Sequence, residues 1–476
     1  MTGVKKKKVV NFTEGPLLWK MILFALPIIG NQLLQVCYNT TDMVVVGYFA
    51  GEDIHEAAVA AVGACGPLIR IFINVFFGIA SGVGICVAQK IGAGAYDQVE
   101  RYIHTSAVFS FIGGVVLMTI GLIATEPLLE ATGVHQAEDP IMFAECVAYM
   151  RTYLVGLPAM MVLNFLSASL RASGITLPTM IFMAISGAAN VVVNLIMVAG
   201  FGMGAAGVGI GTTVAQTMAA VMIVVYMMCC RDRIYHFSFK KLCFDVRKLG
   251  DIVRNGLPVG VQNLILSFSN VIVQTEVNSY GTPVIAGITA ASNLEGYVSI
   301  AMSSVSVAVL TVISQNIGAR KYDRVKKVIW LSILATTVIG ILVGVLFNVF
   351  GEQLLAIYNI GENAESLAAG KTRLLIVCLP YFICGFMEVL SSALKGMKRS
   401  ITAMITSLVG LCVFKVAWIT FVCPLFPRDL EHLPVLLVVF PLAWLITGLT
   451  KLVAIIICFH KDKKKAMLLQ PKLEKI

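Results

Sequence analysis

Charged residues are scarce in this sequence. Asp, Glu, Lys and Arg make up 13% of its 476 residues, whereas hydrophobic residues make up 58%. Soluble domains carry about 25% charged residues, so a water-soluble fold of this length would expose far too much apolar surface. The scarcity excludes a soluble protein and indicates that lipid is the solvent. The net charge of +10 does not indicate nucleic acid, because the basic residues cluster in short segments between apolar runs.

Signatures of catalysis and of bound cofactors are also missing. The sequence contains no G-x-x-x-x-G-K-[ST], G-x-S-x-G or H-E-x-x-H segment. The stretch Gly202-Met-Gly-Ala-Ala-Gly207 matches G-x-G-x-x-G, but it joins two apolar runs with no strand before it. The 12 cysteines show no paired metal-ligand spacing. We therefore expect no enzyme, no cofactor and no structural metal.

Long apolar runs are what the sequence has instead. A helix that crosses a bilayer needs roughly 20 mostly apolar residues. This rule predicts about twelve spans, near 17–46, 57–89, 102–124, 141–168, 177–200, 205–229, 252–279, 284–315, 327–350, 372–394, 401–423 and 434–458. The run after Lys5–Lys8 has no obvious cleavage site, so we interpret it as a retained first span.

Charge alternates between successive loops. Basic residues gather in the segments that begin at Lys5, Lys90, Arg231, Arg320 and Lys395, whereas acidic residues gather near Glu52, Glu126 and Glu352. The positive-inside rule therefore predicts a multi-pass protein of the cell membrane with both termini in the cytoplasm, which requires an even number of spans.

The two halves of the sequence resemble each other. Gln89-Lys-Ile-Gly-Ala-Gly-Ala-Tyr-Asp-Gln-Val99 and Gln315-Asn-Ile-Gly-Ala-Arg-Lys-Tyr-Asp-Arg-Val325 are identical at seven of eleven positions. Leu26-Pro27 matches Leu257-Pro258, and Leu157-Pro158 matches Leu379-Pro380. We predict an all-α polytopic membrane protein, in which two six-helix bundles are related by a pseudo-two-fold axis along the membrane normal. Any substrate site is expected between the halves.

The repeat sets the predicted domain limits. They are a cytoplasmic N-terminal segment (1–16), an N-lobe (17–230), a cytoplasmic linker (231–251), a C-lobe (252–458) and a cytoplasmic basic tail (459–476). Pro27 and Pro258 are predicted to bend the first helix of each lobe, because proline removes a backbone hydrogen bond. Gly78 and Gly82 form a G-x-x-x-G pattern, which predicts close helix packing.

Asp42 is the clearest candidate for function in the N-lobe. An ionisable residue inside a span is costly unless it is paired or hydrated, so it suggests a functional site. The alternative is that Asp42 caps a helix end facing the outer water. Asn190 and Asn194 lie one helical turn apart and so on one face, where Thr212 could join them. These polar residues could equally hold helices together in lipid.

The C-lobe carries secondary candidates. Its acids within or near spans are Glu276, Glu295 and Glu388. Basic residues inside spans are their potential partners, although long basic side chains can also reach the membrane surface. These basic residues are Arg70, Arg151, Lys415 and Lys451.

Several ordered segments together resemble the multidrug and toxic compound extrusion (MATE) family. They are Thr41-Asp42-Met-Val-Val-Val-Gly47, the two Gln-x-Ile-Gly-Ala segments, Leu170-Arg-Ala-Ser-Gly174, and Asn190-Val-Val-Val-Asn194. The resemblance covers nearly the whole chain and is closest to the bacterial DinF-like branch. It implies an antiporter with two lobes forming a V around a central cavity. Such proteins expel organic cations and other amphipathic compounds, driven by inward movement of H+ or Na+.

The resemblance also assigns roles to residues of the N-lobe. It implies that Asp42 is linked to the coupling cation, with Gln35, Asn190 and Thr212 as the other polar positions of the site. The sequence departs from the family where an aspartate often occupies the fifth span, because Asn194 stands there. This departure weakens the expectation of Na+ at Asp42. It favours a single proton carrier at Asp42, or a contribution from Glu276 or Glu388.

The leading hypothesis is thus a cation-coupled exporter that meets membrane lipid and small organic substrates, binds no nucleic acid and works as a monomer. A lipid-linked saccharide flippase is the alternative within transport, since Arg70, Arg151 and Lys415 could supply a cationic cavity. A channel or membrane scaffold is the alternative from another class. Intramembrane acids and mid-span prolines in both halves argue against an inert scaffold.

Overall fold

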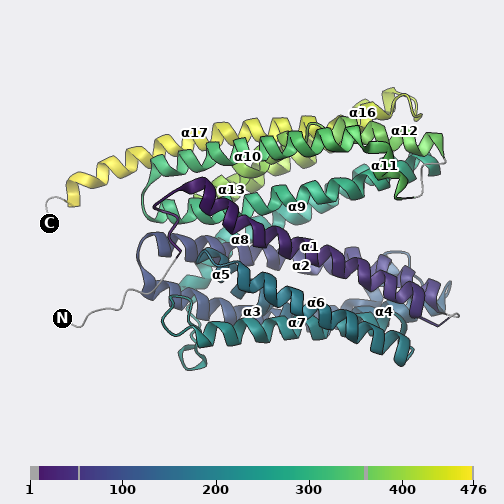
Figure 1. Cartoon of the computed structure of the whole chain (residues 1–476), viewed down its shortest axis with the longest axis horizontal. Coiled ribbons are helices and arrows are strands. Elements are labelled where there is room, and N and C mark those ends of the chain that lie inside the picture. Colours follow the sequence, from purple (N-terminus) through teal and green to yellow (C-terminus); the bar gives the residue numbers. More distant parts are fainter. Residues whose placement is uncertain (1–9, 52–53, 359–362, 474–476) are drawn as a thin grey trace. The chain divides into compact units, whose positions relative to one another are not determined.

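The computed structural model describes residues 10–51, 54–358 and 363–473, and these residues form helices and no β-strand (Figure 1). Ten helical segments are long and apolar enough to cross a membrane. Two bent helix pairs meet the same test, which gives twelve spans when each pair counts as one. The prediction of an all-α protein with about twelve spans is confirmed.

The chain divides into two compact units. Unit 1 contains Leu26–Gly260, and unit 2 contains Phe12–Ala25 and Val261–Ile476. Unit 1 holds α1 (Leu17–Phe49) from Leu26 onward, α2 (His55–Gly92), α3 (Tyr96–Ala131), α4 (Pro140–Val155), α5 (Leu157–Ala172), α6 (Leu177–Leu195), α7 (Gly204–Cys229) and the first part of α8 (Val246–Val277). A π-helical turn, Ile196–Gly200, extends α6, and a short 3₁₀ turn, Phe239–Lys241, precedes α8.

Unit 2 holds the rest of α8 with its 3₁₀ turn Asn278–Tyr280, α9 (Thr282–Gly318), α10 (Tyr322–Val349), α11 (Gly351–Ala356), α12 (Ala364–Arg373), α13 (Tyr381–Gly396), α14 (Ser400–Ser407), α15 (Phe414–Ala417), α16 (Leu433–Leu437) and α17 (Val439–Leu473). Non-α turns lie at Leu374–Cys378, Leu408–Val413, Trp418–Val422 and Cys423–Leu425. Figure 1 shows α9, α10, α13 and α17 running side by side. In unit 2 α13 packs on α9 and α10, as in unit 1 α5 packs on α2 and α3.

The second pair of matched prolines marks the bent spans. Helices α4 and α5 meet at 46° just before Pro158, and the α12 span meets α13 at 43° beside Pro380. Proline cannot donate the backbone hydrogen bond that would continue a straight helix, which explains why both bends fall there. Pro27 and Pro258 instead lie inside α1 and α8, which continue through them. Bending at these two positions therefore stays a prediction.

Helices α1 and α8 each pass from one unit to the other beside their proline. The transitions fall at Ala25/Leu26 and at Gly260/Val261, close to Pro27 and Pro258. The start of each helix therefore packs with the unit that does not contain its remainder. The lobe limits predicted from the order of the spans, 17–230 and 252–458, do not coincide with these two units. These limits stay a prediction.

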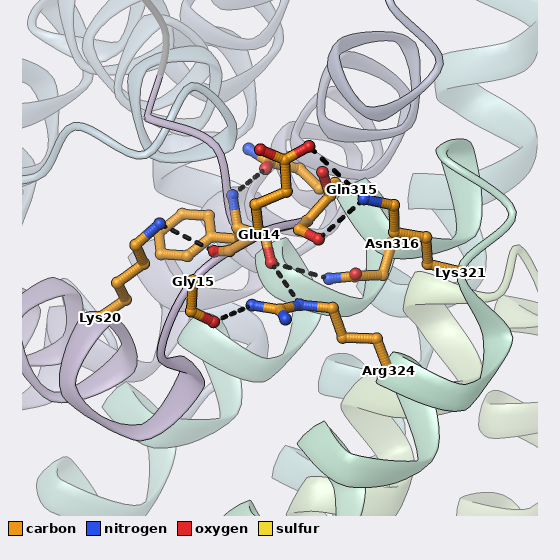
Figure 2. Close-up of polar contacts among 9 residues, drawn as sticks. Glu14, Gly15, Lys20, Gln315, Asn316, Lys321 and Arg324 are labelled. Atoms are coloured by element: carbon orange, nitrogen blue, oxygen red, sulfur yellow. Dashed lines mark hydrogen bonds and ion pairs between the residues drawn. The ribbon is translucent and has the colours of Figure 1, made fainter.

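The segment before α1 is anchored within unit 2 (Figure 2). The Phe12 N–H donates to Gln315 Oε1 at 3.1 Å. Arg324 donates from Nε to the Phe12 carbonyl at 3.1 Å and from Nη2 to the Gly15 carbonyl at 2.6 Å. The buried ring of Phe12 meets Phe24 edge-on, with centroids 5.2 Å apart. These contacts fix residues 12–15 against the turn between α9 and α10.

The glycine pattern of α2 packs closely against α8 within unit 1. A Cβ atom added at Gly78 would overlap the backbone of Gly260, and one added at Gly82 would overlap the Ile252 carbonyl. Gly256 and Gly260 are the facing glycines of α8. Small residues on both helices let the backbones touch. The predicted close packing at Gly78 and Gly82 is confirmed.

We expect Gly82→Ala to lower the melting temperature of the detergent-purified protein, because the added methyl group would force α2 and α8 apart. Overpacking of this kind costs about 1–3 kcal/mol. Gly63→Ala is the matched control, since Gly63 lies on the same helix with open space at its Cβ position. Thermal unfolding followed by tryptophan fluorescence checks the prediction. Equal melting temperatures for the two variants would contradict it.

Candidate functional site

Asp42 lies in the part of α1 that belongs to unit 1 and is only 7% exposed. The two threonines that precede it in α1 do not hydrogen-bond to its carboxylate. Thr40 and Thr41 donate their hydroxyls back to the carbonyls of Val36 and Cys37, at 3.0 and 2.8 Å. The partners of the Asp42 carboxylate must therefore come from other helices.

Three side chains from α6 and α7 converge on Asp42. Asn194 Nδ2 donates to Oδ1 at 2.6 Å, and the Thr212 hydroxyl donates to Oδ2 at 3.4 Å. The Asn190 amide is satisfied at both ends when Nδ2 donates to Asp42 at 3.0 Å and Oδ1 accepts from the Thr212 N–H at 3.2 Å.

The local sequence explains why these groups meet. Asn190 and Asn194 share the buried face of α6, as their four-residue spacing predicts. Gly211 of α7 allows the approach, because a Cβ atom there would overlap Asn194 Oδ1. That oxygen is buried and accepts no hydrogen bond within the described part of the chain. Asn194 thus turns its donor toward the carboxylate and leaves its acceptor unused.

Gln35 does not join this cluster. It is exposed on α1, about two helical turns before Asp42. Sequence reasoning missed Tyr38, whose hydroxyl donates to the Met183 carbonyl of α6 and whose ring fills the space over Gly187. A tyrosine one turn from a buried acid is the signal that could have identified it. Tyr38 ties α1 to α6 one turn from Asp42.

The C-lobe acids lie in different settings. Glu295 of α9 pairs with Arg373 of α12 at 2.7 Å, and the two side chains are 14% and 7% exposed. Arg373 was not among the predicted partners. It lies over the ring of Phe440 at 5.2 Å, and Lys415 Nζ lies 4.5 Å from the centre of the same ring. Lys415 is buried and donates to Asn270 Oδ1 at 3.4 Å. Unit 2 thus holds a mostly buried group of two cations and one acid.

The other charged residues that the sequence singled out lie apart from this group. Glu276 pairs with Arg428 at 3.0 Å, and Arg151 pairs with Glu126 at 2.8 Å. Arg70 is exposed.

Glu388 of α13 is half-buried. Lys451 Nζ is fully buried and makes no hydrogen bond within the described residues.

The negative charge of the Asp42 cluster rests on one side chain. Asp42 is its only acid, and its partners are neutral. The described residues contain no group of three or more His, Cys, Asp or Glu side chains that could hold a metal ion. A lone carboxylate with neutral donors can gain or lose one positive charge without disrupting an ion pair.

The sequence model of the MatE family matches residues 27–196 and 258–419. The "Probable multidrug resistance protein YoeA" of Bacillus subtilis (strain 168) is 28% identical over 391 residues, which cover 80% of this chain and 82% of the relative. The "Multidrug export protein MepA" of Staphylococcus aureus (strain MSSA476) is 22% identical over 403 residues, covering 84% and 87%.

A crystal structure of a MATE protein in the bent conformation shares the fold. Its TM-score is 0.87 at 17% identity, and the match covers 97% of this chain and 100% of that chain. Since the family model matches more than half of the sequence, the chain belongs to the MATE family of membrane transporters.

Proposed function

We propose that this protein is a cation-coupled antiporter that exports amphipathic, often cationic, organic compounds across the cell membrane by alternating access. The observation that carries the proposal is the buried Asp42 carboxylate, held by neutral donors from two other helices. The names of YoeA and MepA, which describe multidrug resistance and multidrug export, support the substrate class. Both termini face the cytoplasm in this proposal.

Of the two candidate coupling ions, H+ fits the cluster better than Na+. Asn194 and Thr212 point donors at Asp42, and so does Asn190 when both ends of its amide are satisfied. Sodium needs oxygen ligands, so its binding would require the Asn194 amide to turn its unused Oδ1 toward the carboxylate. A proton binds a carboxylate oxygen directly and needs no further oxygen ligands.

Protonation of Asp42 would change the packing of α1 within unit 1. Hydrogen bonds to a charged carboxylate are roughly twice as strong as neutral ones, so loss of the charge weakens the contacts that hold α1 against α6 and α7. The two protonation states then favour different arrangements of α1. Substrate and proton need not touch, because each only has to prefer a different state of the protein.

A second candidate function rests on the cations of unit 2. Arg373 and Lys415 outnumber Glu295 around Phe440, so this group carries an excess positive charge. Such a group favours an anionic substrate, as a lipid-linked saccharide flippase requires.

If anionic compounds are the substrates, Lys415→Met should reduce transport of an anionic dye about tenfold and spare a cationic dye, because only the anion uses the lost charge. Dye uptake by vesicles measures both.

We expect Asp42→Asn to lower proton-driven export by about tenfold or more, because asparagine cannot carry the proton that biases the two states. Everted vesicles with an acidic interior should accumulate a cationic dye when they contain the wild-type protein and fail to do so with the variant. A sodium gradient without a pH gradient should drive little uptake.

Glu126→Gln is the matched control for Asp42→Asn, because it also neutralises one acid but lies in an exposed ion pair with Arg151. Its uptake should stay near that of the wild type. Normal transport by Asp42→Asn would show that the assigned site is wrong. Uptake driven by sodium alone would exclude the proton as the coupling ion and leave the role of Asp42 open to direct sodium binding.

The hydrogen-bond donors to Asp42 should affect transport according to their distances from its carboxylate oxygens. Asn194→Leu should impair proton-driven uptake more than Thr212→Val, since Asn194 donates at 2.6 Å and Thr212 at 3.4 Å. Thr217→Val is the control on α7, because Thr217 is exposed and bonds only to its own helix at Thr213. The pH dependence of uptake should shift in Asn194→Leu and remain unchanged in Thr217→Val. Identical pH profiles for all three variants would count against the donor arrangement.

A further inference from the structure

The two copies of the repeated segment form the same turn with different residues. In unit 1 the N–H groups of Gly94 and Ala95 donate to carbonyls of α2, at 3.0 and 2.9 Å. In unit 2 the N–H groups of Arg320 and Lys321 donate to the corresponding carbonyls of α9, at 3.1 and 2.9 Å. Gly94 has φ 70° and Arg320 has φ 56°. An arginine therefore occupies a left-handed position where the first copy has glycine.

The same replacement occurs at a second turn. Gly174, which follows α5, has φ 80°, and Lys398, which follows α13, has φ 59°. Arg320 and Lys398 are the only non-glycine residues with positive φ in the part of the chain that the structure describes. Left-handed backbone disfavours side chains with a Cβ atom. A basic residue elsewhere in each loop would satisfy the positive-inside rule without strain, so topology alone does not explain these positions.

The turns in the two copies of the repeated segment have surroundings of opposite net charge. In unit 2 the turn borders a cavity of about 440 Å³. Its charged lining consists of Arg320, Lys321, Asp323, Arg324, Lys326 and Lys327. The cavity beside the first copy is lined by three acids and two strong bases, namely Asp97, Glu100, Asp245, Arg101 and Lys241. The turn in the second copy therefore borders a basic pocket, whereas the cavity beside the first copy carries more acids than strong bases.

This basic pocket lies where apolar spans end. The spans Thr282–Gly318, Tyr322–Val349 and Leu433–His460 all terminate at or beside it, and Phe459 contributes to its wall. Trp330 of α10 lies three residues after Lys327 and is 68% exposed. Exposed tryptophans near span ends gather at the boundary between membrane and water. A pocket at these span ends would lie at the level of lipid headgroups.

The N-terminal segment uses two of the five cations. Lys321 Nζ donates to the Thr13 carbonyl at 3.0 Å and lies 3.7 Å from the Glu14 carboxylate (Figure 2). Arg324 binds the Phe12 and Gly15 carbonyls. Figure 2 shows both side chains directed at this segment. Their contacts fix the turn and leave its other cations to face the pocket.

We propose that this pocket binds the phosphate headgroup of an anionic lipid through Arg320, Lys326 and Lys327. Phosphate oxygens accept charge-assisted hydrogen bonds from such donors, and basic pockets between membrane helices are suited to lipid headgroups. Lys326 also lies 5.7 Å from the ring centre of Phe459, which gives the pocket an apolar side for the start of the acyl chains. Free phosphate shares this chemistry, but the position at the span ends commits the site to lipid. The inference is independent of the proposed transport activity.

The test measures melting temperature of the full-length protein in detergent. Phosphatidylglycerol should raise the melting temperature of the wild type, and phosphatidylcholine or inorganic phosphate should not. The increase should fall by about half or more in Arg320→Gly and in Lys327→Gln, because each loses a headgroup contact. Without lipid, Arg320→Gly should melt no lower than the wild type, since glycine adopts the left-handed conformation freely. Loss of lipid response is thereby separated from loss of folding.

Arg231→Gln is the control, because it removes one exposed positive charge from unit 1. It should keep the full response to phosphatidylglycerol. An equal response in Arg320→Gly and the wild type would overturn the proposal. So would an equal response to phosphatidylcholine, which would indicate a general lipid effect. Stabilisation by inorganic phosphate alone would also overturn it, because the pocket would then take the free anion.

Discussion

A bilayer core offers no water to polar groups, and this constraint governs the structure from backbone to site. Every backbone N–H and C=O must find a partner within the protein, so the described chain is helical throughout its spans. Hydroxyl side chains obey the same rule, as Thr40 and Thr41 do by bonding back to α1. A carboxylate cannot bond to its own helix in this way. Asp42 is consequently the group around which three helices of unit 1 must arrange their polar side chains.

The two units solve the problem of buried charge differently. In unit 1 neutral amides and a hydroxyl surround a single acid. In unit 2 Glu295 pairs with Arg373, and Lys415 lies near the Phe440 ring and the Asn270 amide. An acid among neutral groups can change its charge without disrupting an ion pair, whereas neutralising Glu295 would strand a buried guanidinium. Unit 1 therefore contains a lone acid, Asp42, that can change its charge. In unit 2 the acid Glu295 is held in an ion pair.

Patterns within single helices predicted much of this architecture. The apolar runs predicted the twelve spans, but the bends beside Pro158 and Pro380 were not predicted, because bending was expected at Pro27 and Pro258. The spacing of Asn190 and Asn194 predicted a shared face, which the structure directs at Asp42. Contacts between distant segments were beyond such patterns. Nothing in the sequence pairs Glu295 with Arg373, or places Gln35 outside the cluster, because both depend on how helices rotate against one another.

The positions at which α1 and α8 change units have a consequence for how the chain arose. The first part of each helix packs with the unit that lacks its remainder. A six-helix half made alone would thus leave the start of its first helix without packing partners. Two copies could satisfy each other by exchanging these segments, as in domain-swapped dimers.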